Sequence, residues 1–227
     1  MAGEAAPGGG TTLVLVPTEL ERRRIEDQGG LAVDATVQAL CGFGPVAAAA
    51  RTASILATLR PARTLLVGIA GAYDVSAHPV GEAFEFDACA IDGVGVGEGP
   101  SRVGPPALGF PQWPGDAGSR PIFDRLRLAT NGDGARLLLT TCAASANVAQ
   151  AAERRERFPH AVAEDMEGFA VATACALHGI PLRIVRGISN RAGDRERERW
   201  RIPAALAAAQ RVARAILESG AGWTTAT

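Results

Sequence analysis

The sequence of 227 residues contains no lysine, and all 23 of its basic side chains are arginines. Schiff-base enzymes, proteins that hold pyridoxal phosphate covalently and Walker-type nucleotide-binding proteins all depend on a lysine side chain. The absence of lysine therefore excludes these three classes of protein.

Cysteine is also scarce. The sequence has four, which are far apart and form no CxxC pair: Cys41, Cys89, Cys142 and Cys175. This pattern fits neither a zinc site nor a disulfide framework. We expect buried, reduced thiols, and neither a metal nor another cofactor.

A strong net charge and long apolar runs are lacking as well. The net charge is −1 at pH 7, which gives no electrostatic reason to expect binding to nucleic acid or to an anionic membrane. No apolar run is long enough to span a bilayer, and the N-terminus lacks a basic region followed by an apolar one. We therefore expect a cytoplasmic protein with neither a nucleic-acid nor a membrane partner.

Apolar strands and helices alternate along the chain, which is typical of an α/β fold with a mostly parallel sheet. About six or seven strands are expected from this alternation. We predict a single domain over residues 11–220, with a central mixed, mostly parallel sheet between layers of helices, after a disordered tail at residues 1–10. The predicted strands include 12–16, 64–67, 82–91, 136–141, 161–163 and 182–185, and the predicted helices include 46–59, 147–157, 167–178 and 202–218.

Residues 92–120 are rich in glycine and proline and show neither a helix nor a strand pattern. So long a segment without regular structure inside a compact domain is usually a lid or a binding loop. We predict one of these roles for it.

Polar residues gather where two predicted strands end. The strand at 161–163 leads into the acids Glu164, Asp165 and Glu167, and the strand at 182–185 leads into a polar turn that ends in Ser189 and Asn190. The helix between them provides the crossover that parallel pairing needs. Ligands bind outside the carboxyl ends of strands in open α/β sheets. We therefore expect Asp165, Glu167, Ser189 and Asn190 to line one crevice.

A second predicted turn follows the strand at 64–67. Its residues, 68–73, include two glycines, which allow backbone N–H groups to approach a ligand closely. The third glycine of a dinucleotide fingerprint is missing, and a purely structural turn explains the segment equally well.

Together, these motifs carry a resemblance. The segment EDMEGFAVA at 164–172 and the segment VRGISN at 185–190 resemble the nucleoside phosphorylase/nucleosidase superfamily. The order of the remaining pieces is similar to that superfamily too, and the resemblance covers most of the chain: Thr18–Glu21, Val67–Gly71, Val80–Glu82 and Phe158–Pro159. It implies the nucleoside phosphorylase-like fold, a small-molecule purine nucleoside as substrate and a homo-oligomer.

Within this superfamily, Asn190 with Gly193, Asp194, Arg195 and Trp200 downstream resembles the futalosine hydrolase family. The resemblance implies hydrolysis of the N-glycosidic bond of futalosine in menaquinone biosynthesis. The products would be hypoxanthine and dehypoxanthine futalosine.

The resemblance also implies roles for individual residues. Cleavage of this bond passes through an electron-poor ribosyl centre, which carboxylates stabilise. Glu167 would bind the ribose hydroxyls and Met166 would lie under the sugar, while Glu21 would activate water, with Glu19 as the weaker candidate. The remaining substrate-binding residues implied are Ile69, Ala70, Gly71, Ser145 and Ser189.

Structural alternatives stand beside these roles. Thr18 and Glu21 have the spacing of a capping box, and local sequence alone favours that role for Glu21. Glu167 could be an acid that the helix dipole favours at the start of a helix. Ser189 and Asn190 could simply form a turn.

Asn190 stands where the adenine-type nucleosidases carry an aspartic acid. An amide cannot titrate, so it cannot pass a proton to N7 of the base. It can donate N–H groups to N7 and O6, which favours a 6-oxopurine over adenine.

Three alternative functions stay open at this stage. The chain could be a purine nucleoside phosphorylase, which differs in its nucleophile, or a methylthioadenosine-type nucleosidase, against which Asn190 argues. It could also be a non-catalytic nucleoside-binding protein, because a fold alone does not guarantee activity.

Overall fold

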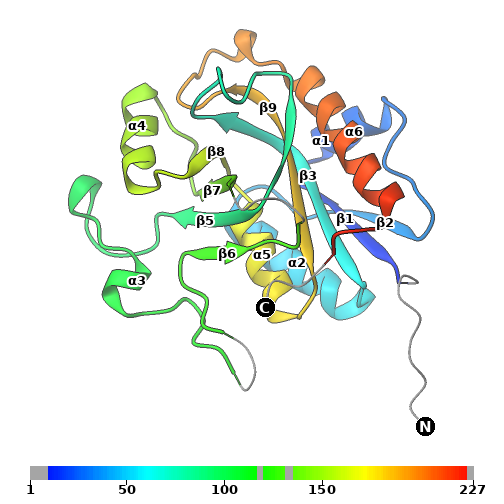
Figure 1. Ribbon diagram of the computed structural model, residues 1–227, viewed down its shortest axis with the longest axis horizontal. Helices are drawn as coiled ribbons and strands as arrows, with labels where there is room; N and C mark the ends of the chain where they lie inside the picture. The colour runs from blue at the N-terminus through cyan, green and yellow to red at the C-terminus, as the bar shows by residue number, and fades with distance from the viewer. Residues whose placement is uncertain (1–9, 117–119, 131–134, 224–227) are drawn as a thin grey trace.

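The computed structural model describes residues 10–116, 120–130 and 135–223, so nine of the ten residues of the predicted tail lie outside the described part. The described residues form a nine-stranded mixed sheet with helices on both faces (Figure 1). The strands are β1 (Thr12–Val16), β2 (Thr36–Leu40), β3 (Arg63–Ala72), β4 (Ala83–Phe86), β5 (Ala88–Asp92), β6 (Arg125–Arg127), β7 (Leu137–Thr141), β8 (Ala161–Asp165) and β9 (Leu182–Arg191).

The helices are α1 (Glu19–Glu26), α2 (Pro45–Leu59), α3 (Pro105–Leu108), α4 (Val148–Arg157), α5 (Gly168–Leu177) and α6 (Ile202–Ser219). The short 3₁₀ helices η1 (Gly99–Ser101) and η2 (Arg197–Arg199) lie in the connections.

The sheet has the order β2-β1-β3-β8-β7-β5-β6, and β9 pairs with both β3 and β4. Pairing is parallel between β1 and β2, β1 and β3, β3 and β9, β5 and β7, and β7 and β8. It is antiparallel between β3 and β8, β4 and β9, and β5 and β6. The predicted three-layer α/β fold, with a mixed and mostly parallel sheet, is confirmed.

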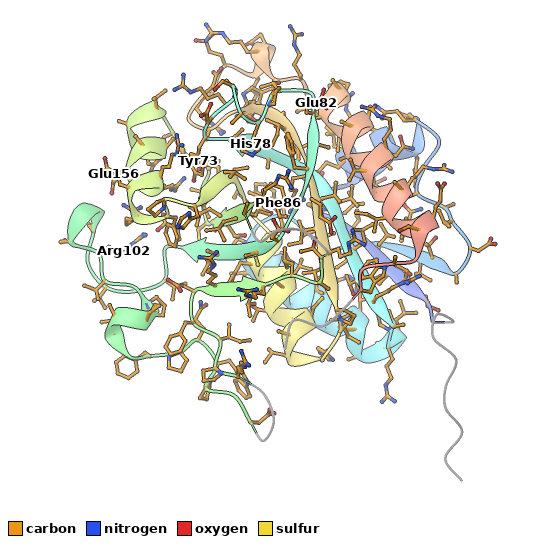
Figure 2. All side chains as sticks on the ribbon, viewed as in Figure 1. Tyr73, His78, Glu82, Phe86, Arg102 and Glu156 are labelled. Atoms are coloured by element: carbon orange, nitrogen blue, oxygen red, sulfur yellow. The ribbon has the colours of Figure 1, made fainter. Side chains whose placement is uncertain are left out.

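Strand β1 shows why the sequence gives three layers. Leu13 and Leu15 pack in one core with α2 and α5, and Val14 and Val16 pack in a second core with α6. Because both faces of the strand are covered, its sequence is a continuous apolar run rather than an alternation. Phe86 of β4, which is fully buried, lies near the middle of the molecule in Figure 2.

The two longest strands differ from the sequence prediction. Both β3 and β9 contain ten residues and pair along their length through the segments predicted as turns. The prediction that these strands end at Val67 and Val185 is therefore wrong. Glycine and polar residues suggest a turn in isolation, but here the strands satisfy each other's backbone groups and the polar side chains find buried partners.

The register of this pair shifts once. Ala70 is opposite Ile188, but Gly71 is opposite Asn190, so Ser189 is the extra residue of a β-bulge. Bulges re-aim side chains and are frequent beside active sites.

Two further segments differ from the sequence prediction. The predicted strand at 82–91 is two strands, because the chain breaks at Asp87, whose Oδ2 accepts a hydrogen bond from Arg136 N at 3.0 Å. Residues 92–120 contain η1, α3 and the bridge Val96–Val103, and Trp113 forms a second bridge with Ile122, just beyond the segment. Residues 117–119 of this segment lie outside the described part, and its role as a lid stays a prediction.

The cysteines are unpaired, and Cys41, Cys89 and Cys175 are buried as expected. Cys142 is exposed, so the prediction of burial is wrong at that position. No helix among the described residues is long and apolar enough to cross a membrane.

Candidate active site

Glu21, at the start of α1, is buried and faces β3. Its Oε2 accepts hydrogen bonds from Thr18 N at 3.1 Å and from the Thr18 hydroxyl at 2.6 Å, and Thr18 Oγ1 accepts from Glu21 N at 3.3 Å. This is the predicted capping box. The other oxygen, Oε1, accepts from Ile69 N on β3 at 3.2 Å. Glu21 therefore caps its helix with one oxygen and reaches the sheet with the other.

Glu19 lies on the surface instead. Its carboxylate pairs with Arg22 at 2.6 Å and Arg23 at 2.8 Å, and its side chain is 41% exposed. Of the two acids considered for water activation, only Glu21 contacts the carboxyl half of β3.

Glu167 is the N-cap residue of α5 but makes no side-chain cap hydrogen bond with that helix. Its Oε1 accepts from Gly44 N, just before α2, at 3.1 Å, and its Oε2 accepts from Arg186 Nη2 at 3.3 Å. The carboxylate, which is 5% exposed, thus joins three elements. Glu167 stands at the start of α5, as the dipole alternative expects, but its side-chain hydrogen bonds go to other elements.

Arg186, on β9, is the centre of this cluster and has no exposed surface. Its guanidinium donates to Asp165 Oδ2 from Nε at 3.1 Å and from Nη2 at 2.5 Å, besides its bond to Glu167. Nη1 is buried and has no hydrogen-bond partner in the part of the chain that the structure describes. Sequence reasoning treated Arg186 as part of a turn. The signal missed in the sequence is that Arg186 directly follows the apolar residues Ile184 and Val185. A charged residue buried with such a stretch needs a partner.

Gly68 of β3 is what allows this close approach. A Cβ at this position would lie 2.1 Å from Arg186 Nη1 and 2.9 Å from Glu21 Oε1. The same measurements place the guanidinium and the Glu21 carboxylate side by side against the strand. Glu21, Glu167 and Arg186 therefore form one buried cluster, and we name these three residues with Asp165 the charged cluster.

Burial raises the pKa of two members of the charged cluster, Glu167 and Glu21. Burial raises the pKa of Glu167 to about 7; the charge of Arg186 opposes this rise, and repulsion from Asp165 and Glu21 adds to it. Burial also raises the pKa of Glu21, although Thr18, Arg186 and the Ile69 N–H lower it. Both acids keep their protons to a higher pH than an exposed glutamate does, as acids in active sites often do.

Asn190 is the second-last residue of β9, four positions after Arg186, and is opposite Gly71. Its Nδ2 donates to Arg191 O at 2.8 Å, and its Oδ1 accepts from Ser189 Oγ at 2.7 Å. The amide orientation follows from chemistry, because a backbone carbonyl can only accept and so must face the NH₂ group. Asn190 keeps one N–H group for a ligand, and its oxygen is occupied by Ser189.

The other predicted residues divide into two groups. Ile69, Ala70 and Gly71 are consecutive residues of β3. Ile69 N donates to Glu21, and Gly71 pairs with Asn190. Met166 is half-buried in the short link between β8 and α5, directly before Glu167. These residues surround the carboxyl ends of β3, β8 and β9.

Ser145 belongs to a different network. Its hydroxyl donates to Glu164 Oε2 at 2.6 Å and accepts from Arg154 Nη1 at 2.8 Å. Tyr73 also donates to Glu164, at 3.0 Å, and Arg154 pairs with Asp92, which pairs in turn with Arg157 and Arg102. Tyr73 and Arg102 lie on the α4 side of the molecule in Figure 2. The Ser145 hydroxyl and its backbone N–H, which donates to Glu164 Oε1 at 2.7 Å, both bond within this network, and the residue has no exposed surface.

The sequence profile of one family, described as the phosphorylase superfamily, matches residues 28–218. The chain belongs to this superfamily. It is 38% identical over 174 residues to the futalosine hydrolase of Streptomyces coelicolor, an overlap of 74% of this chain and 72% of that one. It is 32% identical to the futalosine hydrolase of Thermus thermophilus, with 92% and 96% of the two chains covered.

Solved nucleosidase structures share the fold. The 5′-methylthioadenosine/S-adenosylhomocysteine nucleosidase of Colwellia psychrerythraea, in complex with adenine, superposes with a TM-score of 0.73 at 20% identity. The match covers 96% of this chain and 99% of that one.

Among the described residues, no group of three or more histidine, cysteine, aspartate or glutamate side chains is placed to hold a metal ion.

Proposed function

We propose that the protein hydrolyses the N-glycosidic bond of futalosine and releases hypoxanthine and dehypoxanthine futalosine. The observation that carries this proposal is the position of Glu21 and Glu167 around Arg186, with Asn190 further along the same strand, β9. The similarity to two futalosine hydrolases, one of them over nearly its whole length, supports the choice of substrate.

The chemistry assigns a task to each acid. Glu167 accepts hydrogen bonds from the ribose hydroxyls and stabilises the positive charge that develops at C1′. Glu21 takes a proton from water, whose oxygen forms a bond to C1′ as the bond from C1′ to the purine breaks. Met166 provides an apolar surface for the sugar. The raised pKa of Glu21 makes it a stronger base than an exposed glutamate.

Asn190 acts on the leaving base. Its available N–H group donates to the acceptor edge of hypoxanthine, N7 and O6, and stabilises the negative charge that the base gains. The base takes its proton from solvent, because the amide has none to give. Ser189 holds the Asn190 oxygen, so the amide presents a donor rather than an acceptor to the base.

Charge balance favours water over phosphate as the nucleophile. Arg186 is the cation of the charged cluster, and it already interacts with Asp165, Glu167 and Glu21. A phosphate would add negative charge beside these carboxylates, and repulsion would oppose its binding. Water meets no such barrier.

The direct test is an incubation of the pure protein with futalosine in phosphate-free buffer. We expect hypoxanthine to be released at a rate that added phosphate does not increase. Release that depends on phosphate would indicate a phosphorylase. Binding without release would indicate a nucleoside-binding protein, and a preference for methylthioadenosine would indicate the other nucleosidase type.

Replacement of Glu21 tests the assigned base. Glu21→Gln should lower kcat by about a hundredfold or more with little change in substrate binding, because the amide cannot take a proton from water and Glu21 has no assigned contact with the substrate. Glu19→Gln is the matched control, since Glu19 lies two residues away in a surface ion pair. Equal rates for wild type and Glu21→Gln would refute the role of Glu21.

The wider setting is also part of the proposal. The reaction belongs to menaquinone biosynthesis in the cytoplasm, and the protein works as a homo-oligomer. Chromatography with light scattering measures the oligomeric state directly.

A further inference from the structure

Asp165 is the member of the charged cluster with no task in the proposed reaction. Its Oδ1 accepts from the Thr140 hydroxyl at 2.7 Å, and its Oδ2 accepts from Gly168 N at 2.8 Å and from two nitrogens of Arg186. The Thr140 oxygen accepts in turn from Phe169 N at 2.7 Å. The carboxylate is thus fixed by β7 and by the first turn of α5, and it presents one oxygen to the guanidinium.

Arg186 depends on this carboxylate for its orientation. Asp165 binds Nε and Nη2 at 3.1 and 2.5 Å, whereas Glu167 binds only Nη2, at 3.3 Å. With that edge held, Nη1 is directed toward Gly68 and Glu21. A side chain held at one edge by a short charged hydrogen bond has little freedom to rotate.

We propose that Asp165 is a positioning residue, which holds Arg186 between Glu21 and Glu167 and so fixes the geometry and charge of the catalytic carboxylates. The proposal rests on the function proposed above. It assigns Asp165 no contact with the substrate.

The charges around Arg186 give the proposal a measurable consequence. The groups that face it are Asp165 of β8, Glu167 before α5, Glu21 of α1 and the Cys41 thiol after β2. Burial raises the pKa of Cys41 to about 12, so that thiol stays neutral. Cys89 of β5 faces Asp165, and burial raises its pKa as well. Asp165 is therefore the carboxylate that competes with Glu21 and Glu167 for the single guanidinium.

The substitution Asp165→Asn removes the charge and nearly keeps the shape. We expect kcat on futalosine to fall about tenfold to a hundredfold, because small displacements of catalytic groups cost that much. KM should change far less, because Asp165 does not contact the substrate. The acidic limb of the pH–rate profile should move to lower pH, since Glu21 and Glu167 no longer share Arg186 with Asp165.

Glu85→Gln is the matched control. Glu85 accepts two hydrogen bonds, at 2.5 and 2.7 Å, from Arg183, a largely buried arginine three residues before Arg186 on β9. This variant removes a carboxylate from an arginine pair on the same strand, away from the charged cluster. It should leave kcat and the pH–rate profile as in the wild type.

A measurement without substrate separates this inference from the proposed function. Carbon-13 NMR of labelled glutamate carboxyl groups follows Glu167 directly, and Asp165→Asn should lower its pKa even if futalosine is not the substrate. Failure of wild type to act on futalosine overturns the function alone. An unchanged Glu167 titration overturns the positioning role.

A second pair of variants covers the case in which Asp165→Asn does not fold. Thr140→Val removes the hydrogen bond to Asp165 Oδ1, and Thr140→Ser keeps it. We expect kcat to fall several-fold for the valine variant only, without a matching change in KM. Equal kcat values for both variants would overturn the inference.

Discussion

At the scale of single residues, the candidate site buries ionisable side chains. The protein interior disfavours their charged forms. Glu21, Glu167, Asp165 and Arg186 are each at most 6% exposed. Removing one partner from such a group leaves an uncompensated charge, so individual substitutions should have large effects. Asn190 differs, because it is neutral and partly accessible to a ligand.

Asn190→Asp tests how the base is selected. Aspartic acid can offer a proton to N7, and its carboxylate form can accept from a 6-amino group, so preference should move from futalosine toward its 6-amino counterpart. We expect the ratio of kcat/KM values to change by about tenfold or more. Asn190→Ala should slow both substrates without reversing their order. A stronger preference for the 6-oxopurine in Asn190→Asp would contradict the hydrogen-bond argument.

At the scale of secondary-structure elements, β9 links the site to the core. Arg186 of this strand belongs to the charged cluster, and the next residue, Gly187, lies against α6. A Cβ at Gly187 would be 2.0 Å from Ala205 O and 2.5 Å from Ala205 C. Backbone atoms of a packed helix cannot move aside as a flexible side chain can, so α6 fits against β9 only if this residue is glycine.

Gly187→Ala should therefore destabilise the protein by about 1–3 kcal/mol or more, through displacement of α6 from the sheet. Denaturant unfolding measures this loss. Gly104→Ala is the control, because a Cβ there would lie 3.7 Å from its nearest neighbour, Asp124 Oδ2, and its φ of −85° suits any residue. Equal stability of the two variants would contradict the close contact between Gly187 and the α6 backbone.

At the scale of the whole molecule, the buried acids connect function to stability. The pKa of Glu167 in the folded protein, about 7, is above its ordinary value of 4.5. Folding thus favours the protonated acid. The associated stability is fully present below about pH 4.5 and is lost as the pH rises through 7. At a pH where Glu167 is ionised, as the proposed reaction requires, its buried charge lowers the free energy of unfolding.

Glu167→Gln mimics the protonated acid at every pH. We expect it to match the wild type near pH 4.5 and to be more stable at pH 8, by on the order of 2–3 kcal/mol, while activity is lost. Thermal melts at both pH values measure this difference. Glu198→Gln, at an exposed position, should not show a pH-dependent gain. A Glu167→Gln variant less stable than wild type at pH 8 would contradict the assigned pKa direction.

The sequence by itself determined the layered fold and most of the residues that meet at the site. Continuous apolar runs such as residues 12–16 can only be buried on both faces, and the capping box at Thr18 and Glu21 depends on a spacing of three residues. The order of local motifs was also sufficient to indicate the superfamily. These features depend on neighbours in the chain, which a sequence displays directly.

Only the tertiary structure decided the length of β3 and β9, the partners of Arg186 and the separate network of Ser145. Whether residues 186–190 form a turn or a strand depends on the β3 residues opposite them, which are more than a hundred positions away. The partners of a buried charge likewise come from other strands and helices: Arg186 meets Asp165 of β8 and Glu21 of α1. Local spacing contains no record of such contacts, because they exist only once the layers have packed.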